Sequence, residues 1–196
     1  MANFKTMIRT LMFVFVVLFC ATTFYYYTEQ GNARAEANIP KLPDFEHTNN
    51  QQFIDNVVQC VNYIEHNTTD VYPVNLELLL AQAALESGWG NSRFARVGKN
   101  LFGIRTYDLK EPHMLPSNNP KKWGVKVYSH ECDSVLNYMQ VLNNGGAYEK
   151  YRELMSNDEN DPYILVETLD AYASDKYYFS KVKSILTKIR SEYAIK

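Results

Sequence analysis

The sequence predicts an α+β domain that is mainly helical and carries a small β-lobe. Apolar residues recur at helical spacing in several separate segments, of which Phe53 to Ile64 is the first. One stretch between these segments, Tyr107 to Lys121, is rich in turn residues, and the alternating run Trp123 to Tyr128 follows it. Helices flanking one short β-hairpin region are typical of the α+β class.

The first two helices are expected at about Asn50 to His66 and at Leu76 to about Ser87. The first is amphipathic, whereas the second (LELLLAQAAL) is apolar nearly all round, which predicts burial on most of its faces. Asn75 is a suitable N-cap, and Gly88 suits a left-handed residue at the end of the helix. This central helix therefore ends at Glu86-Ser87-Gly88.

The remaining elements follow from capping and breaking residues. We expect a short helix from Asn91 to Arg96 closed by Gly98, and a strand or an extended turn from Asn100 to Ile104. A helix over about His130 to Asn143, capped by Ser129, should follow. Further helices are expected from Tyr148 to Met155, from Pro162 to about Tyr172 after the cap Asp161, and from about Tyr177 to Tyr193, with Tyr178, Val182, Ile185 and Ile189 facing inward.

Composition and charge exclude several classes of protein. The chain has 196 residues, of which 46% are hydrophobic and 21% charged, so it is expected to form one globular domain with a short extra segment. Twenty Lys and Arg residues against 22 Asp and Glu residues give a net charge of −2. Without a basic surplus, nucleic acid is not an expected partner.

Residues 1–35 are expected to be a signal peptide or an N-terminal membrane anchor. Lys5 and Arg9 precede an uncharged stretch, Leu11 to Thr28, which is just long enough to span a bilayer. Ala33-Arg34-Ala35 offers a cleavage pattern, so both alternatives stay open. Residues 36–49 are interpreted as a linker and residues 50–196 as the folded domain, exported to the periplasm or the cell envelope and either anchored in the inner membrane or secreted.

The exported part has two cysteines, Cys60 and Cys132. An oxidising compartment permits a bridge between them, but two separate thiols fit the sequence equally well. The four histidines, His47, His66, His113 and His130, show no metal-ligand spacing with these cysteines. Neither a metal site nor a cofactor is predicted.

Glu86 is the candidate catalytic residue. A carboxyl group at the C-terminal end of a buried helix lies near a partial negative charge and beside apolar surface, and both effects raise its pKa. A raised pKa suits a general acid, which must hold a proton to give to a leaving oxygen. An exposed glutamate at a helix end is the commoner explanation for such a residue.

The surrounding motif changes that balance. The run Ala81 to Ile104 (AQAALESGWGNSRFARVGKNLFGI), with Trp123-Gly124 some 20 residues later and Tyr172-Ala173-Ser174-Asp175 near the end, resembles glycoside hydrolase family 73. These are bacterial peptidoglycan glucosaminidases, also described as mannosyl-glycoprotein endo-beta-N-acetylglucosaminidase-like domains. The resemblance covers Asn50 to Ile189 and is strongest to the Bax-like branch of the family.

The resemblance implies a lysozyme-like fold that hydrolyses the β-1,4 bond after N-acetylglucosamine in peptidoglycan. It implies Glu86 as the catalytic acid and Tyr172 as the tyrosine at the catalytic cleft. Phe102 and Gly103 would border the sugar groove. For Phe102 and Trp123, core packing and sugar stacking are equally good interpretations, and Tyr128 fits a structural role better than its alternative, substrate binding.

The second carboxylate is not marked by any motif. The resemblance places it in the β-lobe, where the sequence offers Asp108 and Glu111, and we weigh the two equally. Glu131 is interpreted as an acid favoured by the dipole of the first helical turn. Without a second acid, the acetamido group of the substrate could attack the anomeric carbon itself.

Two other functions remain open on the same fold. The chain could bind peptidoglycan as a scaffold without cutting it, or it could be a cell-wall amidase. The amidase is the weaker alternative because zinc-dependent amidases need metal ligands that the sequence does not show.

Overall fold

The computed structural model describes residues 8, 12, 15, 17–30, 39–117 and 122–195, and the chain divides after Ile39 into two compact units. In the N-terminal unit, residues 17–30 are helical. Part of the predicted apolar segment, including Leu11, Phe13, Val14 and Val16, lies outside the described residues. Within the part of the chain that is described, no helix combines the length and hydrophobicity needed to cross a bilayer.

The second unit, Pro40–Lys196, begins with two helices in the predicted places. Helix α2 (Asn50–Asn67) is capped by the side chain of Asn49, which accepts a hydrogen bond from the backbone of Gln52. Helix α3 (Leu76–Ser87) is capped by Asn75 and ends at Gly88, which is left-handed as predicted, with φ of 58°. Most residues of α3 are buried, which confirms that it is the central helix.

The β-lobe follows the short helix α4 (Arg93–Gly98), which Ser92 caps. Its strands are β1 (Arg105–Thr106), β2 (His113–Met114) and β3 (Gly124–Lys126), in the order β1-β3-β2. Both pairings are antiparallel, with Arg105 opposite Val125 and His113 opposite Lys126. The lobe therefore has one more strand than the predicted hairpin, because β2 forms within the segment that was expected to be turns.

The remaining helices complete the domain. They are α5 (Glu131–Asn144), the 3₁₀ turn η1 (Gly146–Tyr148), α6 (Glu149–Ser156), α7 (Pro162–Leu165), the 3₁₀ turn η2 (Val166–Thr168) and α8 (Tyr178–Glu192). The predicted helix after Pro162 thus ends before Tyr172, at Thr168. On α8, Leu186 is buried where Ile185 was expected, and Ile185 is only half-buried.

The N-cap of α5 was predicted wrongly. His130, not Ser129, caps this helix: its ring accepts a hydrogen bond from the backbone of Cys132, while Asp133 binds the backbone of His130 in return. The other ring nitrogen of His130 contacts the backbone oxygen of Pro43 at 3.1 Å. Residues Pro43 to Thr48 were expected to belong to a linker, but Pro43 is buried and the segment packs on the domain.

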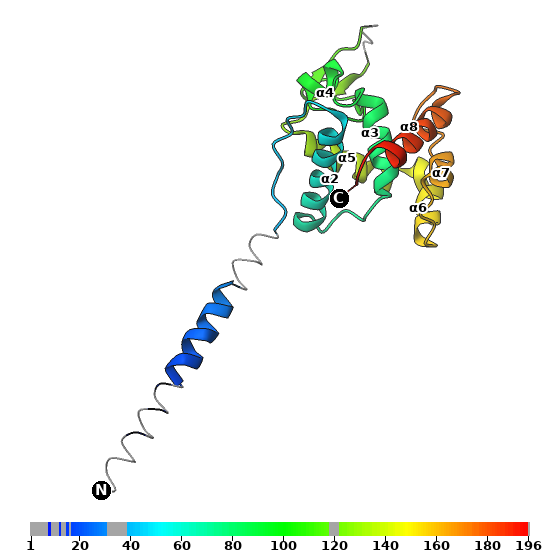
Figure 1. Ribbon diagram of the computed structural model, residues 1–196. Coiled ribbons are helices and arrows are strands. Elements are labelled where there is room, and N and C mark those ends of the chain that lie inside the picture. The colour runs from blue at the N-terminus through cyan, green and yellow to red at the C-terminus, as the bar shows by residue number, and fades with distance from the viewer. Residues whose placement is uncertain are drawn as a thin grey trace. The chain divides into compact units, whose positions relative to one another are not determined.

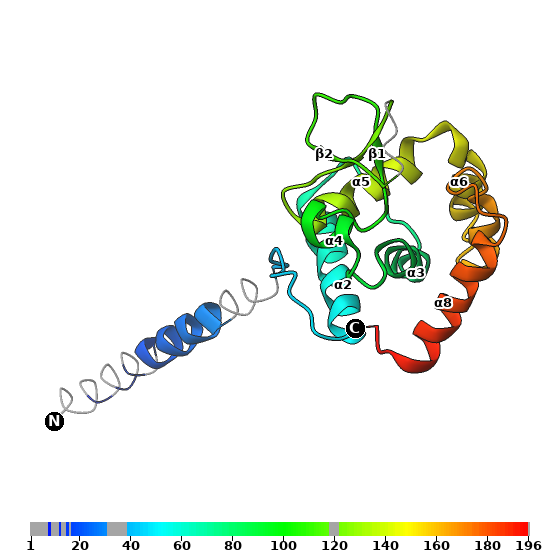
Figure 2. The same cartoon turned by 90° about the horizontal axis from the view of Figure 1, so that it is seen from above.

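The core surrounds α3. Figure 2 views this helix nearly end-on, with α2 and α5 on one side and α8 on the other, while the β-lobe lies beyond α4. Figure 1 shows the same order of elements from the side. The mainly helical α+β class with a small β-lobe is therefore confirmed. Because α3 is central, any polar group on it is held inside the protein or at one of the two ends of the helix.

Candidate active site

Glu86 is the second-last residue of α3, and its side chain is half-buried. The turn after it is fixed by the buried Ser87, whose hydroxyl donates to the Ala83 carbonyl at 2.5 Å and accepts from the backbone N–H of Gly90 at 2.7 Å. A rigid turn holds the last residues of the helix in one conformation. The Glu86 carboxyl is therefore presented from a fixed backbone rather than from a flexible loop.

The sequence Gly88-Trp89-Gly90 forms that turn, and all three residues have positive φ. A Cβ at Gly90 would lie 2.6 Å from a ring carbon of His47, so only glycine fits there. His47 also contacts the backbone oxygen of Trp89 through its Nε2 at 3.0 Å. The segment before α2 thus supports the turn that follows Glu86, a role for His47 that the sequence alone did not indicate.

Burial raises the pKa of the Glu86 carboxyl above its ordinary value of 4.5, and a hydrogen bond from the Tyr178 side chain partly opposes this rise. The negative end of α3 adds to the cost of a charge at this position. The prediction of a raised pKa is confirmed. Tyr138, Tyr172 and Tyr178 are the titratable groups that interact with the carboxyl group.

The loop opposite Glu86 is built around the buried side chain of Asn100. Its amide nitrogen donates to the backbone oxygens of Ile104 and Lys126, at 2.9 and 2.8 Å, and its oxygen accepts from the backbone of Ile104 at 3.1 Å. Gly103 in this loop has φ of +65°, and a Cβ on it would lie 3.7 Å from Oε2 of Glu86. Of the strand and the turn that the sequence left open here, the structure has the turn, which brings an exposed backbone next to the carboxyl group.

Phe102 lies in the core. Its ring is only 2% exposed and stacks on the ring of Tyr138, with 4.2 Å between centroids. Of the two interpretations left open for this residue, the structure favours core packing over sugar stacking. Its backbone contributes in another way, because the Phe102 carbonyl accepts a hydrogen bond from the Tyr172 hydroxyl at 3.0 Å.

Tyr172 lies in the turn before α8, and its ring stacks on that of Tyr178, with 5.7 Å between centroids. Burial raises the pKa of the Tyr172 hydroxyl well above its ordinary value, and the nearby Glu86 carboxylate adds to this rise. The hydroxyl therefore stays neutral and able to donate a hydrogen bond. The structure brings Tyr172 into the surroundings of Glu86, as the resemblance implied.

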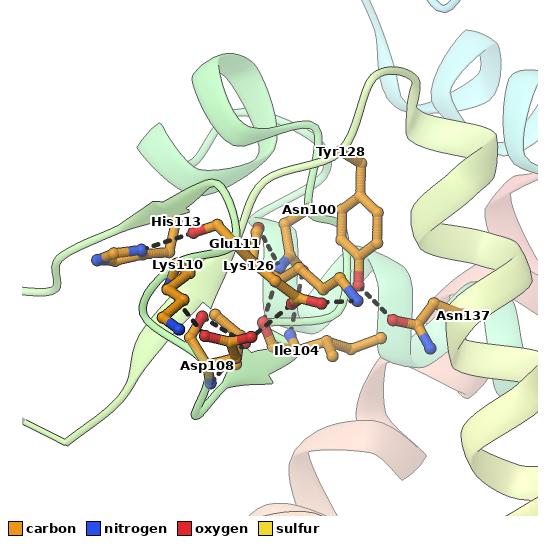
Figure 3. Close-up of polar contacts among 10 residues, drawn as sticks. Asn100, Ile104, Asp108, Lys110, Glu111, His113, Lys126, Tyr128 and Asn137 are labelled. Atoms are coloured by element: carbon orange, nitrogen blue, oxygen red, sulfur yellow. Dashed lines mark hydrogen bonds and ion pairs between the residues drawn. The ribbon is translucent and has the colours of Figure 1, made fainter.

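The two candidate second carboxylates lie in the connection between β1 and β2 (Figure 3). Asp108 accepts a hydrogen bond from the backbone of Lys110 at 2.9 Å, which is a local turn contact. Glu111 instead accepts from the Thr106 hydroxyl at 3.0 Å and faces the Lys126 ammonium group at 3.6 Å. Only Glu111 is thus tied to both β1 and β3.

The other aromatic candidates are fixed by polar neighbours. The guanidinium of Arg105 lies over the half-buried ring of Trp123, 4.0 Å from its centroid. Tyr128 donates to the side chain of Asn137 at 2.8 Å, as Figure 3 shows, and links the segment after β3 to α5. The structural interpretation of Tyr128 is supported by this contact.

Cys60 and Cys132 form a disulfide between α2 and the first turn of α5. The structure thus decides between the two alternatives that the sequence left open. His130 lies beside this pair, with its ligand atom within 4.8 Å of the sulfurs, which the spacing in the sequence did not reveal. Both sulfurs are bonded to each other, and the imidazole caps α5, so these residues have other roles in this structure.

Glu131 opens α5 and is buried, and it forms an ion pair with Lys99 at 2.8 Å. A cavity of about 410 Å³ lies beside this pair. It is bounded by the segment before α2 and by α4, and Glu86 does not line it. The environment of Glu86, rather than this cavity, therefore defines the candidate active site.

A mainly helical domain that presents a protonatable carboxyl from the end of its central helix, beside a small β-lobe, has the arrangement of a glycosidase of the lysozyme type. Residues 65–191 match the family model described as Mannosyl-glycoprotein endo-beta-N-acetylglucosaminidase. This match covers more than half of the chain, so the chain belongs to the glucosaminidase family, whose members are glycoside hydrolases.

Individual relatives agree with this assignment. The chain is 33% identical over 135 residues to the peptidoglycan hydrolase FlgJ of Vibrio parahaemolyticus, covering 60% of this chain and 42% of that protein. It is 27% identical over 127 residues to the exo-glucosaminidase LytG of Bacillus subtilis, covering 60% and 45%. The alignments span less than half the length of the curated relatives that they match.

A solved structure resembles the fold. The catalytic domain of the autolysin Auto from Listeria monocytogenes superposes with a TM-score of 0.54 at 25% sequence identity, over 83% of this chain and 94% of that domain. The similarity thus extends over nearly all of a solved catalytic domain.

Proposed function

We propose that this protein hydrolyses the β-1,4 bond after N-acetylglucosamine in peptidoglycan and that Glu86 is its general acid. The observation that carries the proposal is the half-buried carboxyl at the end of α3, whose pKa is raised by burial. A carboxyl with a raised pKa holds its proton to a higher pH and can give it to a leaving oxygen. The names of the relatives, which include peptidoglycan hydrolases, support the choice of substrate.

In the substrate-assisted route, Glu86 gives its proton to the glycosidic oxygen while the bond from that oxygen to the anomeric carbon breaks. The acetamido oxygen of the same sugar forms a bond to the anomeric carbon and produces a cyclic oxazolinium ion. Water then opens this ring, and the Glu86 carboxylate takes the proton that the water loses. One proton leaves Glu86 and one returns, so the enzyme is regenerated.

Of the two candidates for a second catalytic carboxylate, we propose to test Glu111 before Asp108. The Glu111 side chain is 44% exposed, so solvent and substrate can reach it, and its contacts to Thr106 and Lys126 hold it to two strands. Asp108 is engaged with its own turn. If Glu111 is a nucleophile or base, Glu111→Gln will lose activity while Asp108→Asn keeps it. Equal activity of both variants favours the substrate-assisted route.

Digestion of purified peptidoglycan by the full chain, followed by mass spectrometry of the soluble products, tests the proposal. We expect fragments that end in a reducing N-acetylglucosamine. Binding to insoluble peptidoglycan without release of fragments would support the scaffold alternative instead. New amino groups without new reducing ends would support the amidase.

We further infer that the domain works outside the cytoplasm, in the periplasm or at the cell envelope. The Cys60–Cys132 disulfide suits an oxidising compartment, and the substrate lies there. The assignment of residues 11–28 to a signal or a membrane anchor stays a prediction, and the mass of the mature protein tests it.

A further inference from the structure

Gln82 is a polar residue inside the most apolar helix of the domain. It lies one helical turn before Glu86 on α3 and is 0% exposed. A buried primary amide is costly unless both its ends are hydrogen-bonded. Its oxygen accepts from the hydroxyl of Tyr138 on α5, and its nitrogen donates to the hydroxyl oxygen of Tyr178 on α8 at 2.7 Å.

This chain of hydrogen bonds has one direction. A phenol has a single hydrogen, and that of Tyr138 goes to the Gln82 oxygen. The Gln82 amide must then point its nitrogen at Tyr178, whose oxygen is occupied as an acceptor. The hydrogen of Tyr178 is left free to be donated. The Glu86 carboxyl, one helical turn after Gln82 on α3, is a neighbouring acceptor, and its charge adds to the rise that burial causes in the pKa of Tyr178.

We propose that Tyr178 is a positioning residue for Glu86. The Tyr138–Gln82–Tyr178 chain aims a hydroxyl donor at one carboxyl oxygen, so that the acid form carries its proton on the other oxygen. The inference rests on the proposed role of Glu86 as general acid, and it adds how the proton is placed. A carboxylic acid needs one oxygen for its proton, and a donor aimed at the first oxygen leaves only the second for it.

The surroundings fit this role. The Glu86 carboxyl lies beside Gly103, which is exposed, whereas Tyr178 is only 4% exposed. The ring of Tyr172 stacks on Tyr178, and this fixes the plane of the phenol. Tyr178 is also the first residue of α8, whose packing against α3 keeps the hydroxyl in reach.

The titratable groups that interact with Glu86 come from three elements of the described structure. They are Tyr178 of α8, Tyr172 of the preceding turn and Tyr138 of α5, and burial raises the pKa of each well above its ordinary value. All three are therefore neutral across the range in which a carboxyl group titrates. A change in the titration of Glu86 on removal of one hydroxyl thus reports a lost hydrogen bond rather than a lost charge.

The donor also helps after the proton has left. A hydrogen bond to the ionised form lowers the pKa of a carboxyl and so opposes the rise that burial causes at Glu86. Tyr178 therefore has two effects in the proposed mechanism. It leaves the proton on the other oxygen, and it stabilises the carboxylate that remains.

The experiment is a ¹³C NMR titration of the Glu86 side-chain carboxyl in the full chain, compared between wild type and Tyr178→Phe. The phenylalanine keeps the ring that stacks on Tyr172 and removes only the donor. We expect the midpoint of Glu86 to rise by about one pH unit, as for the loss of a hydrogen bond to a charged group. In the dependence of activity on pH, the fall in activity on the basic side should also move to a higher pH, and the maximal rate should decrease.

Tyr151→Phe is the matched control, because its hydroxyl is also buried in the domain but accepts from the backbone of Asn75, far along α3 from Glu86. It should leave the midpoint of Glu86 unchanged. A purely structural role of Tyr178 would lower the activity of Tyr178→Phe without moving the midpoint or the fall in activity on the basic side, and that result would overturn the proposal.

A measurement on the unaltered protein covers the case in which Tyr178→Phe does not fold. The ¹³C signal of the Tyr178 ring carbon that bears the hydroxyl should change at the midpoint of Glu86, whereas that of Tyr151 should not. A Tyr178 signal that ignores the ionisation of Glu86 would refute the proposal. Both NMR readouts are independent of catalysis, so a protein that passes them yet does not cut peptidoglycan would refute the proposed function alone.

Discussion

The Tyr172 hydroxyl donates a hydrogen bond to the backbone carbonyl of Phe102 at 3.0 Å. This bond joins the turn before α8 to the loop that carries Gly103, although the two residues are 70 positions apart. The Phe102 ring is meanwhile fixed by stacking on Tyr138. The loop beside Glu86 is therefore held from both its backbone and its side chain.

Tyr172→Phe should separate the effect of the Tyr172 hydroxyl from that of its ring, because it removes only the hydroxyl. The ring can still stack on Tyr178, so we expect the free energy of unfolding to fall by only about 1 kcal/mol. The effect on activity should be larger, a loss of up to about 100-fold, because a small displacement of the loop misplaces the substrate relative to Glu86. Denaturant unfolding and initial rates of peptidoglycan solubilisation measure the two effects. Unchanged rates would show that this bond does not serve the site.

Gly103→Ala tests the conformation of the same loop. A Cβ at this position would meet Oε2 of Glu86 only at 3.7 Å, an ordinary contact, so the cost should come from the positive φ of +65°. We expect a loss of about 1–2 kcal/mol in the free energy of unfolding. Gly146→Ala is the control, because a Cβ added there would meet no atom within 4 Å and its φ is not positive. Equal effects of the two substitutions would contradict this explanation.

The Cys60–Cys132 disulfide closes a segment of 72 residues that contains α3 and the whole β-lobe. Replacing both cysteines by serine should lower the free energy of unfolding by about 2–4 kcal/mol, since the unfolded chain regains freedom over this segment. Unfolding of the wild type with and without a reducing agent gives the same comparison without mutation. A double variant as stable as the oxidised wild type would show that the bridge contributes nothing.

The raised pKa of Glu86 also predicts how stability depends on pH. The folded protein binds this proton more tightly than the unfolded chain does, so the stabilising contribution is complete below about the ordinary value of 4.5 and is lost as the pH rises through the folded value. Glu86→Gln cannot ionise and keeps an uncharged group at every pH. We therefore expect Glu86→Gln to be more stable than wild type at pH 7 and equally stable at pH 4.

Thermal unfolding at the two pH values checks this expectation. Glu77→Gln provides the comparison, because Glu77 lies at the other end of α3 and pairs with Arg190 on the surface. It should show no gain in stability at pH 7. A Glu86→Gln protein that is less stable than wild type at pH 7 would contradict the cause that we assign to the pKa.

The sequence predicted the helices well because their signals are local. Asn75 and Gly88 bound α3 where their capping preferences placed them, and the apolar run between them is buried as its composition requires. The cap of α5 was missed because a histidine performs it, and the other nitrogen of its ring contacts the backbone oxygen of Pro43, 87 residues away. A local pattern does not report such a distant partner.

The site was predicted in part for the same reason. Glu86 could be chosen because its motif is continuous in the sequence. The resemblance also pointed to Tyr172, but Tyr138 and Tyr178 could not be chosen, because they come from other helices and look like ordinary core residues. Gln82 was the one available signal, as a lone amide within an apolar helix. The role of Phe102 also depended on packing against Tyr138, which only the fold supplies.

Peptidoglycan digestion by Glu86→Gln, Glu77→Gln and wild type at the same concentration is the most direct test of the proposed mechanism. If Glu86 donates the proton, its amide should reduce the release of soluble fragments by about 100-fold or more, while the Glu77 variant cuts like wild type. Thermal unfolding of the same samples verifies that all three are folded. A folded Glu86→Gln protein that releases fragments at the wild-type rate would contradict the central claim.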